Sequence, residues 1–436
     1  MGTKDKSSQI ITGASSGNSG ILHTGFDTVP QTLESKLVRR GYELYQLFAE
    51  DIKLPIKKIG AYIIAWKQNE LEIFKEIIDN AHKNNVIDIE EISSDALYER
   101  EPLIHAGALG ALYIPGESIV DPLTIPLILY MHSKILGGHA QMNIEVTNGT
   151  YDRKHNHWIL NDGQFKSRVV INCAGLFGDF VEQIRINQQF PPTSTFTIRP
   201  RIGQFSVYSS KTLSPPIKSI LLPLPTKFSK GIIIYPNLFN QIIIGPTAEE
   251  QLDRCKAPIK LDITKMLHDK ATELIPTFSQ SEYKYIGSYT GIRPATEYSD
   301  YQIHSYNDLQ WICCGGIRST GLTSSLAIGE YVNNKLNEMM SIKHQLHCTG
   351  YSLEHYSLSL KQLKSMFKLT PIGLQPNVVA GKQKLVATSV GNIHVDDNIT
   401  TSNVRIDCDG QFYDISHSLL KLAWSTRQSS LISAKL

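Results

Sequence analysis

A strand–turn–helix unit near residue 315 most constrains how this chain folds. Leu309–Cys314 is an apolar strand, Gly315–Gly321 is a turn with three glycines, and a helix is predicted from Leu322 to about Met339. Glycines after a buried strand permit a tight turn, and the following helix presents free backbone N–H groups to an electronegative group. A plain strand-to-helix crossover without a ligand has the same local pattern.

The remaining pattern predicts a mixed α/β protein. Further helices are expected at about 31–50, 71–84, 121–136 and 262–274. Strands are expected at 59–66, 142–146, 157–160, 165–172, 195–198, 204–207, 231–235 and 241–245, with a hairpin at Asp162-Gly163. After residue 345 the chain is rich in Ser, Lys and Thr and poor in periodic segments, which indicates a separate appendage.

Composition excludes several classes of protein. With 41% hydrophobic and 19% charged residues, the 436-residue chain is typical of a globular protein. A net charge of +2 gives no broad positive electrostatic field that would attract nucleic acid. An anionic partner must therefore be held by a few individual Arg or Lys side chains. The six cysteines are scattered and form no Cys-x-x-Cys pair, which favours reduced, mostly buried thiols and no metal site. No apolar stretch is long enough for a transmembrane helix.

Four other segments carry candidate chemistry. Gly13–Gly20 is a small-residue turn that matches neither the Walker loop nor G-x-G-x-x-G, and Val169–Gly175 is a strand ending in small residues that let a ligand approach the backbone. Arg293 lies between glycine and proline and is a candidate anion clamp, and His23 is a candidate base. Each has a competing structural interpretation. Gly13–Gly20 can be a flexible turn and Val169–Gly175 a strand-to-helix turn. Arg293 can be a surface charge and His23 a structural histidine.

Taken together, these segments resemble one family, the FAD-dependent glycerol-3-phosphate dehydrogenases and L-2-hydroxyglutarate oxidases. The matching stretches follow one another in family order over about residues 10–340. They are Asn18–Asp27, Pro30–Leu37, Gly107–Pro122, Val170–Gly175, Gly231–Ala248, Gly291–Pro294, Asp300 and Gly315–Thr323.

The resemblance implies an incomplete FAD-binding Rossmann-like domain interleaved with a substrate domain built on a mixed β-sheet. The FAD-binding parts would be about 9–50, 140–180 and 290–340, the substrate-domain parts about 51–120 and 190–289, within a domain of residues 1–345. Residues 346–436 would be an appendage of unknown role.

The same resemblance implies the residues of the site. His23 would accept the proton of the substrate hydroxyl, and Arg293 would bind the substrate's phosphate or carboxylate, with Arg318 a weaker candidate. The residues implied to contact FAD are Ser15, Asn18, Ser19, Gly20, Ala174, Gly175, Gly315, Gly316, Ile317, Ser319, Gly321, Leu322 and Thr323. No metal ligand is implied.

Two departures from the family pattern stand out. No G-x-G-x-x-G loop and no acidic residue for the ribose are found, and nothing before Gln9 can be either, so the chain is expected to start past that unit and to bind FAD poorly. Only Cys348 and Cys408 follow the predicted fold, too few for the four-cysteine iron–sulfur site of some relatives.

Three functions remain open on these grounds. Oxidation of glycerol 3-phosphate, with quinone or oxygen as electron acceptor, is favoured, because Phe26-Asp27 departs from the aromatic residues expected in L-2-hydroxyglutarate oxidases. L-2-hydroxyglutarate is the alternative substrate. A non-catalytic remnant that holds no FAD is the alternative of another class. The sequence does not separate a cytoplasmic from a mitochondrial protein, and it gives no sign of a nucleic-acid partner.

Overall fold

The computed structural model describes residues 2–4, 11–52, 54, 56–136, 138–189, 196–210, 217–224, 231–279 and 283–340, together with the backbone of four short strands between 383 and 413. The rest of the predicted appendage lies outside these residues. The helices of the described part are α1 Leu33–Ile52, α2 Gln68–Lys83, α3 Ser94–Arg100, α4 Thr124–Ile135, α5 Gly178–Ile186, α6 Leu261–Leu274 and α7 Gly321–Met339, with short 3₁₀ helices η1 Ala14–Gly17, η2 Gly175–Phe177 and η3 Pro276–Ser279.

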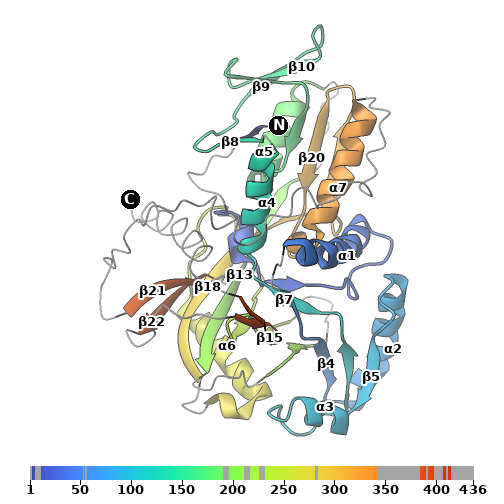
Figure 1. Ribbon diagram of the computed structural model, residues 1–436, viewed down its shortest axis with the longest axis vertical. Coiled ribbons are helices and arrows are strands. Elements are labelled where there is room, and N and C mark those ends of the chain that lie inside the picture. Colours follow the sequence, from blue (N-terminus) through green and yellow to red (C-terminus); the bar gives the residue numbers. More distant parts are fainter. Residues whose placement is uncertain are drawn as a thin grey trace.

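A nine-stranded sheet forms the lower half of the molecule (Figure 1). Its neighbours are antiparallel except for the parallel pair β14–β4, which joins segment 61–114 to segment 198–296. In spatial order the strands are β17 Glu249–Glu250, β13 Ile198–Ser210, β16 Gln241–Gly245, β15 Ile233–Pro236, β14 Ile220–Leu222, β4 Ala61–Ala65, β6 Gly110–Ile114 and β5 Glu90–Ser93, with β18 Tyr283–Thr296 on the other edge of β13.

Helices cover both faces of this sheet. Alternate side chains of β4 point to opposite faces, as the pleat requires. Ala61 and Ile63 pack with Phe74 and Ile77 of α2, whereas Tyr62 and Ile64 belong to the core that includes α3 and α6. All five residues of β4 are therefore buried, and the strand reads as a continuous apolar run.

A second sheet lies in the upper half, between α5 and α7 (Figure 1). Strand β20 (Trp311–Gly315) is parallel to β12 (Val170–Asn172) and antiparallel to β19 (Gln302–Tyr306). Trp311 and Cys313 pack in the core that includes α5, and Ile312 and Cys314 pack in the core that includes α7. The predicted strand–turn–helix unit is thus present, with α7 starting at Gly321.

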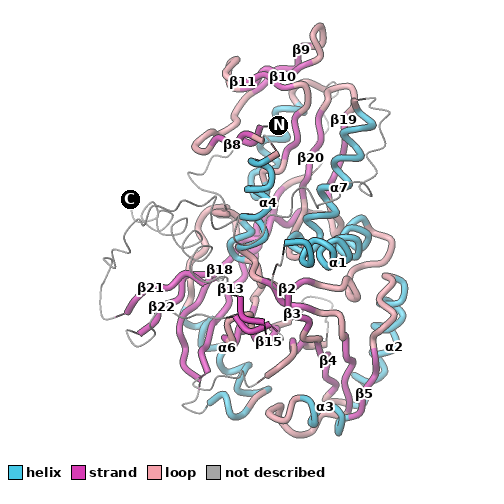
Figure 2. The backbone as a smooth tube through the Cα atoms, viewed as in Figure 1, coloured by secondary structure: helices cyan, strands magenta, loops and turns pink. Residues whose placement is uncertain are grey.

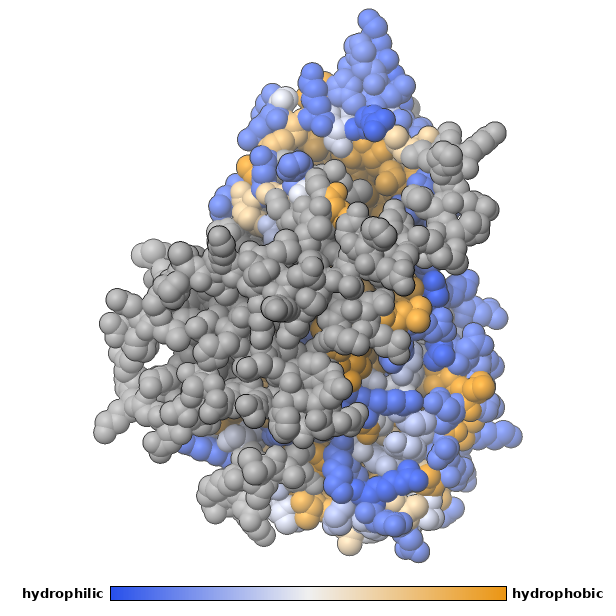
Figure 3. All heavy atoms as spheres, in the orientation of Figure 1, coloured by the Kyte–Doolittle hydropathy of each residue, from blue (hydrophilic) through white to orange (hydrophobic). Residues whose placement is uncertain are grey.

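Smaller sheets complete the described part. The strands β9, β10 and β11 project at the top of Figure 2, and Figure 3 shows that the surface there is hydrophilic. The small sheets are β2 Ile21–Leu22 with β7 Ser118–Val120 and β3 Ile56–Lys58; β9 Gly149–Asp152 with β10 His157–Leu160 and β11 Phe165–Ser167; β1 Gly2–Lys4 with β8 His139–Gln141; β21 Gln383–Thr388 with β22 Gly391–Asp396; and β23 Ile406–Cys408 with β24 Gln411–Tyr413.

The predicted mixed α/β class is confirmed, but some strand predictions are wrong. Residues 142–146 form no strand, because the Asn161 side chain bonds the Glu145 carbonyl (2.7 Å) and the Thr147 N–H (3.0 Å) in place of a neighbouring strand. Segment 165–172 divides into β11 and β12, which belong to different sheets. The predicted strands 195–198 and 204–207 merge into the single long strand β13.

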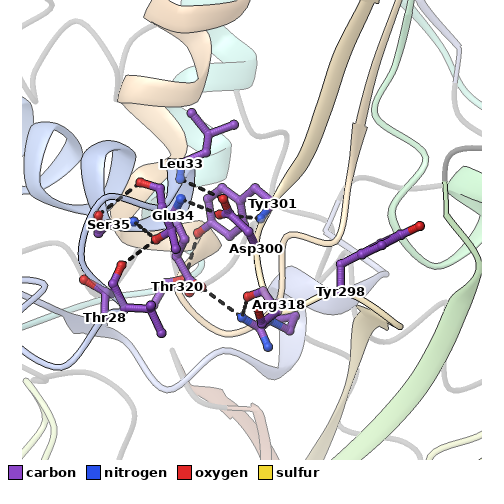
Figure 4. Close-up of polar contacts among 12 residues, drawn as sticks. Thr28, Leu33, Glu34, Ser35, Tyr298, Asp300, Tyr301, Arg318 and Thr320 are labelled. Atoms are coloured by element: carbon purple, nitrogen blue, oxygen red, sulfur yellow. Dashed lines mark hydrogen bonds and ion pairs between the residues drawn. The ribbon is translucent and has the colours of Figure 1, made fainter.

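Asp300 fastens the start of α1 to the residues just before β19 (Figure 4). Its two carboxylate oxygens accept the backbone N–H groups of Leu33 and Glu34, each at 2.8 Å. The Glu34 carboxylate in turn accepts hydrogen bonds from Thr320 (2.6 Å) and Arg318 (2.9 Å) in the turn before α7. One carboxylate thereby satisfies two N–H groups that a helix N-terminus otherwise leaves unbonded.

Replacing Asp300 should weaken this connection without touching the core. We expect Asp300→Ala to lower the free energy of unfolding by about 1–3 kcal/mol, because two charge-assisted bonds to the helix terminus are lost. Urea denaturation measures the change. Asp308→Ala, an exposed site in the turn between β19 and β20, is the matched control and should stay within about 0.5 kcal/mol of the parent. Equal midpoints for the two variants would contradict this role of Asp300.

Candidate active site

Residues 13–20 lie directly on strand β18. A Cβ atom on Gly17 would stand 2.3 Å from the Cα atom of Gly291, so no other residue fits there without a shift of the backbone. On the other side of this turn, the Tyr235 hydroxyl donates to the Ser19 carbonyl at 2.9 Å. The predicted cofactor residues Ser15 to Gly20 are therefore held against the large sheet.

The chain then turns sharply into β2. Gly20 has φ of +77°, and its N–H group donates to the Asn18 side chain at 2.8 Å. A Cβ atom on Gly20 would lie 2.5 Å from the Val120 carbonyl oxygen, so glycine is required both by conformation and by the close approach of β7. This turn places Ile21 and Leu22 in the core and brings His23 to the end of the strand.

His23 is held from two sides. Its backbone N–H donates to the Thr323 hydroxyl at 3.1 Å, which ties it to the first turn of α7. Its ring nitrogen Nδ1 lies 3.0 Å from Oε2 of Glu117. The side chain is 20% exposed, whereas that of Glu117 is 1% exposed. The ring is thus partly accessible and backed by a buried carboxylate.

Glu117 is a site residue that the sequence analysis did not single out. Its second oxygen, Oε1, accepts the Thr24 N–H at 2.7 Å and the Thr24 hydroxyl at 2.9 Å. The carboxylate therefore has hydrogen bonds on both oxygens, as a buried charge requires. One signal could have found it: Glu117 is the only acidic residue in the otherwise apolar and small-residue stretch 110–120.

The first turn of α7 presents backbone N–H groups without competition from acidic side chains. It contains no Asp or Glu, and the N-cap residue Thr320 makes no side-chain capping bond. Gly316 has φ of +67° in the preceding turn, which residues with side chains rarely adopt. Of the residues predicted to contact FAD here, Thr323 is placed directly beside His23.

Ala174 and Gly175 lie at the same sheet edge as Gly315 and Gly316. Strands β12 and β20 are parallel, with Asn172 opposite Cys313, so their carboxyl ends reach these small residues together. Ligands of open parallel sheets bind at such an edge. Gly175 has φ of +54°, and the space that its side chain would fill is open. The expectation of buried thiols holds for Cys313 and Cys314, but Cys173 and Cys255 are exposed.

Arg293 is a partly buried cation without an acidic partner in the described residues. Both terminal nitrogens of its guanidinium donate to the Thr247 carbonyl, each at 3.2 Å. The absence of a side chain at Gly203 leaves the room for it. Burial, assisted by the nearby Arg201 charge, lowers the pKa of Arg293 to about 10, so the group remains charged at neutral pH. It can therefore bind an anion.

Arg318 is placed differently. Its guanidinium forms an ion pair with Glu34 at 2.9 Å and also donates to the Ser299 carbonyl (Figure 4). These contacts give it a structural partner at the N-terminus of α1. The prediction that Arg318 binds substrate stays a prediction.

Two general features of the described residues bear on the kind of site. They contain no group of three or more His, Cys, Asp or Glu side chains that could hold a metal ion. In the same residues no helix has the length and apolar character needed to cross a membrane.

Comparison with known protein sequences gives three findings. The family model described as FAD dependent oxidoreductase matches residues 5–334. A glycerol 3-phosphate dehydrogenase of Caloramator mitchellensis is 27% identical over 320 residues, which cover 72% of this chain and 64% of that protein. The mitochondrial L-2-hydroxyglutarate dehydrogenase of Arabidopsis thaliana is 26% identical over 389 residues, covering 76% of this chain and 77% of that protein.

A solved structure is similar to the fold. The dithionite-reduced L-α-glycerophosphate oxidase from Mycoplasma pneumoniae, with FAD bound, superposes with a TM-score of 0.70 at 25% sequence identity, covering 77% of this chain and 88% of that one.

Proposed function

The chain belongs to the family of FAD-dependent oxidoreductases, and we propose that it oxidises the hydroxyl group of a small anionic 2-hydroxy compound, with glycerol 3-phosphate as the first candidate. The observation that carries this proposal is the partly buried Arg293 cation, whose bonds in the described residues go to a backbone carbonyl. A guanidinium that has lost part of its contact with water is stabilised by an anion, and it pairs bidentately with phosphate or carboxylate.

The described residues fit the ring end of FAD. Gly175 offers open space beside the backbone, and the first turn of α7 offers N–H groups to an electronegative ring edge. We propose that these residues, with the segment from Ser15 to Gly20 and the turn Gly315–Thr323, hold the flavin. Bound FAD would supply a two-electron acceptor for the alcohol carbon.

The residues do not fit the ADP half of the cofactor equally well. No two glycines are separated by one residue anywhere in the 436 residues, so the chain has no G-x-G-x-x-G loop. Such a loop holds the pyrophosphate through backbone N–H groups. We propose that residues 1–436 by themselves bind FAD weakly for this reason.

In this proposal His23 and Arg293 contact different groups of the substrate. The ring nitrogen of His23 that points away from Glu117 accepts the hydroxyl proton, and Arg293 holds the anionic group. Both are anchored close to η1: Gly17 of η1 lies on Gly291, two residues before Arg293, and β2 follows η1 and leads to His23. A quinone or oxygen would reoxidise the flavin.

L-2-hydroxyglutarate is the second candidate substrate. The similarity to the L-2-hydroxyglutarate dehydrogenase of Arabidopsis thaliana favours this substrate. The carboxylates of L-2-hydroxyglutarate can pair with the guanidinium of Arg293. Turnover of both compounds with an artificial dye as acceptor separates the two.

Removing the imidazole of His23 should slow turnover. With FAD and substrate in excess, His23→Ala is expected to lower kcat by ~10²–10⁴-fold, the usual contribution of a positioned general base. His155→Ala is the control, because His155 is exposed on the β9–β10 hairpin and pairs with Asp152. A kcat within about threefold of the parent for His23→Ala would remove His23 from the proposed role.

Replacing the guanidinium of Arg293 by an ammonium group should weaken substrate binding. Lysine keeps the charge but loses the planar fork, so Arg293→Lys is expected to raise KM by roughly 10-fold or more. Arg201→Lys is the matched control: Arg201 stands opposite Arg293 on β13 but is exposed and pairs with Glu250. Unchanged steady-state constants for Arg293→Lys would show that the anion is held elsewhere.

The affinity for FAD tests whether the absence of a G-x-G-x-x-G loop weakens cofactor binding. Loss of about three charge-assisted hydrogen bonds, at ~1.5–3 kcal/mol each, corresponds to about 5–9 kcal/mol or roughly four to six decades in Kd. Purified residues 1–436 should therefore be colourless, and a flavin fluorescence titration should give a Kd that is high-micromolar or weaker. The Mycoplasma pneumoniae oxidase, whose structure holds FAD, is the positive control. Stoichiometric flavin absorbance in the purified chain would overturn this proposal.

A further inference from the structure

We infer that Glu117 is a positioning residue that fixes the tautomer and the orientation of the His23 ring. The inference rests on the proposed function, because a tautomer matters for turnover only if His23 exchanges a proton with the substrate. The hydrogen bond between Glu117 and the His23 ring can be tested without turnover.

The Glu117 carboxylate is saturated by donors from one short segment. Oε1 accepts the backbone N–H of Thr24 at 2.7 Å and its hydroxyl at 2.9 Å, and Oε2 faces Nδ1 of His23 at 3.0 Å. Glu117 is buried as a whole residue, so water does not compete for these bonds. Both Thr24 donors bind to Oε1. Oε2 can therefore accept a hydrogen bond from Nδ1–H of the His23 ring.

This geometry selects one form of the neutral imidazole. A neutral histidine carries a single ring proton, and a carboxylate can only accept. The proton must therefore be on Nδ1, and Nε2 is then the ring nitrogen that carries the lone pair. Because the His23 N–H is also bonded to Thr323, both the ring and the backbone of this residue are fixed.

The charge of Glu117 has His23 as its one titratable hydrogen-bond partner in the described residues. Tyr42 of α1 approaches from the other side, but its hydroxyl donates to the Gly116 carbonyl at 2.7 Å. Burial, with a smaller contribution from the charges of Glu117 and Asp88, raises the pKa of Tyr42, so this hydroxyl stays neutral. The carboxylate can therefore stabilise the imidazolium that forms when His23 takes up a proton, as in other carboxylate–histidine pairs.

A purely structural role for Glu117 makes a different prediction. Glu117 would then only tie the residues before β7 to Thr24, and its replacement would lower stability without changing the protonation of the ring. The two roles are separated by a variant that preserves the shape of the side chain and changes its hydrogen-bonding character.

Glu117→Gln is that variant. The amide has one oxygen, which the two Thr24 donors will hold, so its NH₂ group must face Nδ1 of His23. The ring can accept this hydrogen bond only with its proton on Nε2, where it blocks uptake of the substrate proton. With FAD and substrate in excess, kcat should fall by ~10²–10⁴-fold while KM stays within about threefold.

Nitrogen NMR of the full chain labelled with ¹⁵N-histidine reads the tautomer directly, and the spectrum of His23→Gln assigns the His23 signals. The parent should show protonated Nδ1 and unprotonated Nε2, and Glu117→Gln should show the reverse. Thr24→Val is the matched control: it removes one bond to the same carboxylate but keeps the contact with the ring, so the parent tautomer should persist.

Each outcome decides the inference. A neutral His23 protonated at Nε2 in the parent, or the same tautomer in the parent and in folded Glu117→Gln, would overturn it. A reversed tautomer supports it, and the kinetics then judge the proposed function separately. If the tautomer reverses while His23→Ala turns over like the parent, Glu117 positions His23 but His23 is not the base.

Discussion

The antiparallel pairing of β13 with β18 is the interaction on which the rest of the arrangement depends. The register runs from Ile198 opposite Thr296 to Ser210 opposite Tyr283, with one irregularity between Val207 and Tyr208. Strand β13 continues the hydrogen bonding into β16 and hence into the whole large sheet. Strand β18 carries both Gly291, which contacts η1, and Arg293. A shift of this register by one residue would turn every one of these side chains to the opposite face.

Close backbone approaches at glycines bring the two halves of the site together. Gly17 and Gly291 let η1 lie on β18, and Gly41 lets α1 cross α7, because a Cβ atom at Gly41 would stand 2.1 Å from the Thr323 carbonyl oxygen. The second crossing sets the position of the first turn of α7, and the Thr323 hydroxyl there holds the backbone of His23. Backbone contacts of this kind leave little freedom, so the proposed base is placed by packing as much as by its own hydrogen bonds.

Three arginines of the described residues differ in the partners that they bind. Arg318 with Glu34 and Arg185 with Glu182 are paired within the protein, which explains them as parts of the fold. Arg293 has a carbonyl where the others have a carboxylate. Removing a cation from water without a counter-charge is costly, so the lack of an acidic partner for Arg293 among the described residues supports the proposal that a substrate supplies the anion.

The sequence by itself determined the local elements and the family. The glycine turn before α7, the periodic faces of α1, α2 and α6 and the Asp162-Gly163 hairpin depend on neighbours within a few residues, so their chemistry is visible in the chain. The order of the motifs indicated an FAD-dependent oxidoreductase, which the match over residues 5–334 confirms. Tertiary structure decided what lies far apart in the chain. Glu117 meets His23 across 94 residues, and Glu34 occupies Arg318 across 284. Residues 142–146 fail to form a strand because a distant asparagine bonds their backbone. Burial and the identity of a charge's partner depend on how distant segments pack, and no local pattern encodes them.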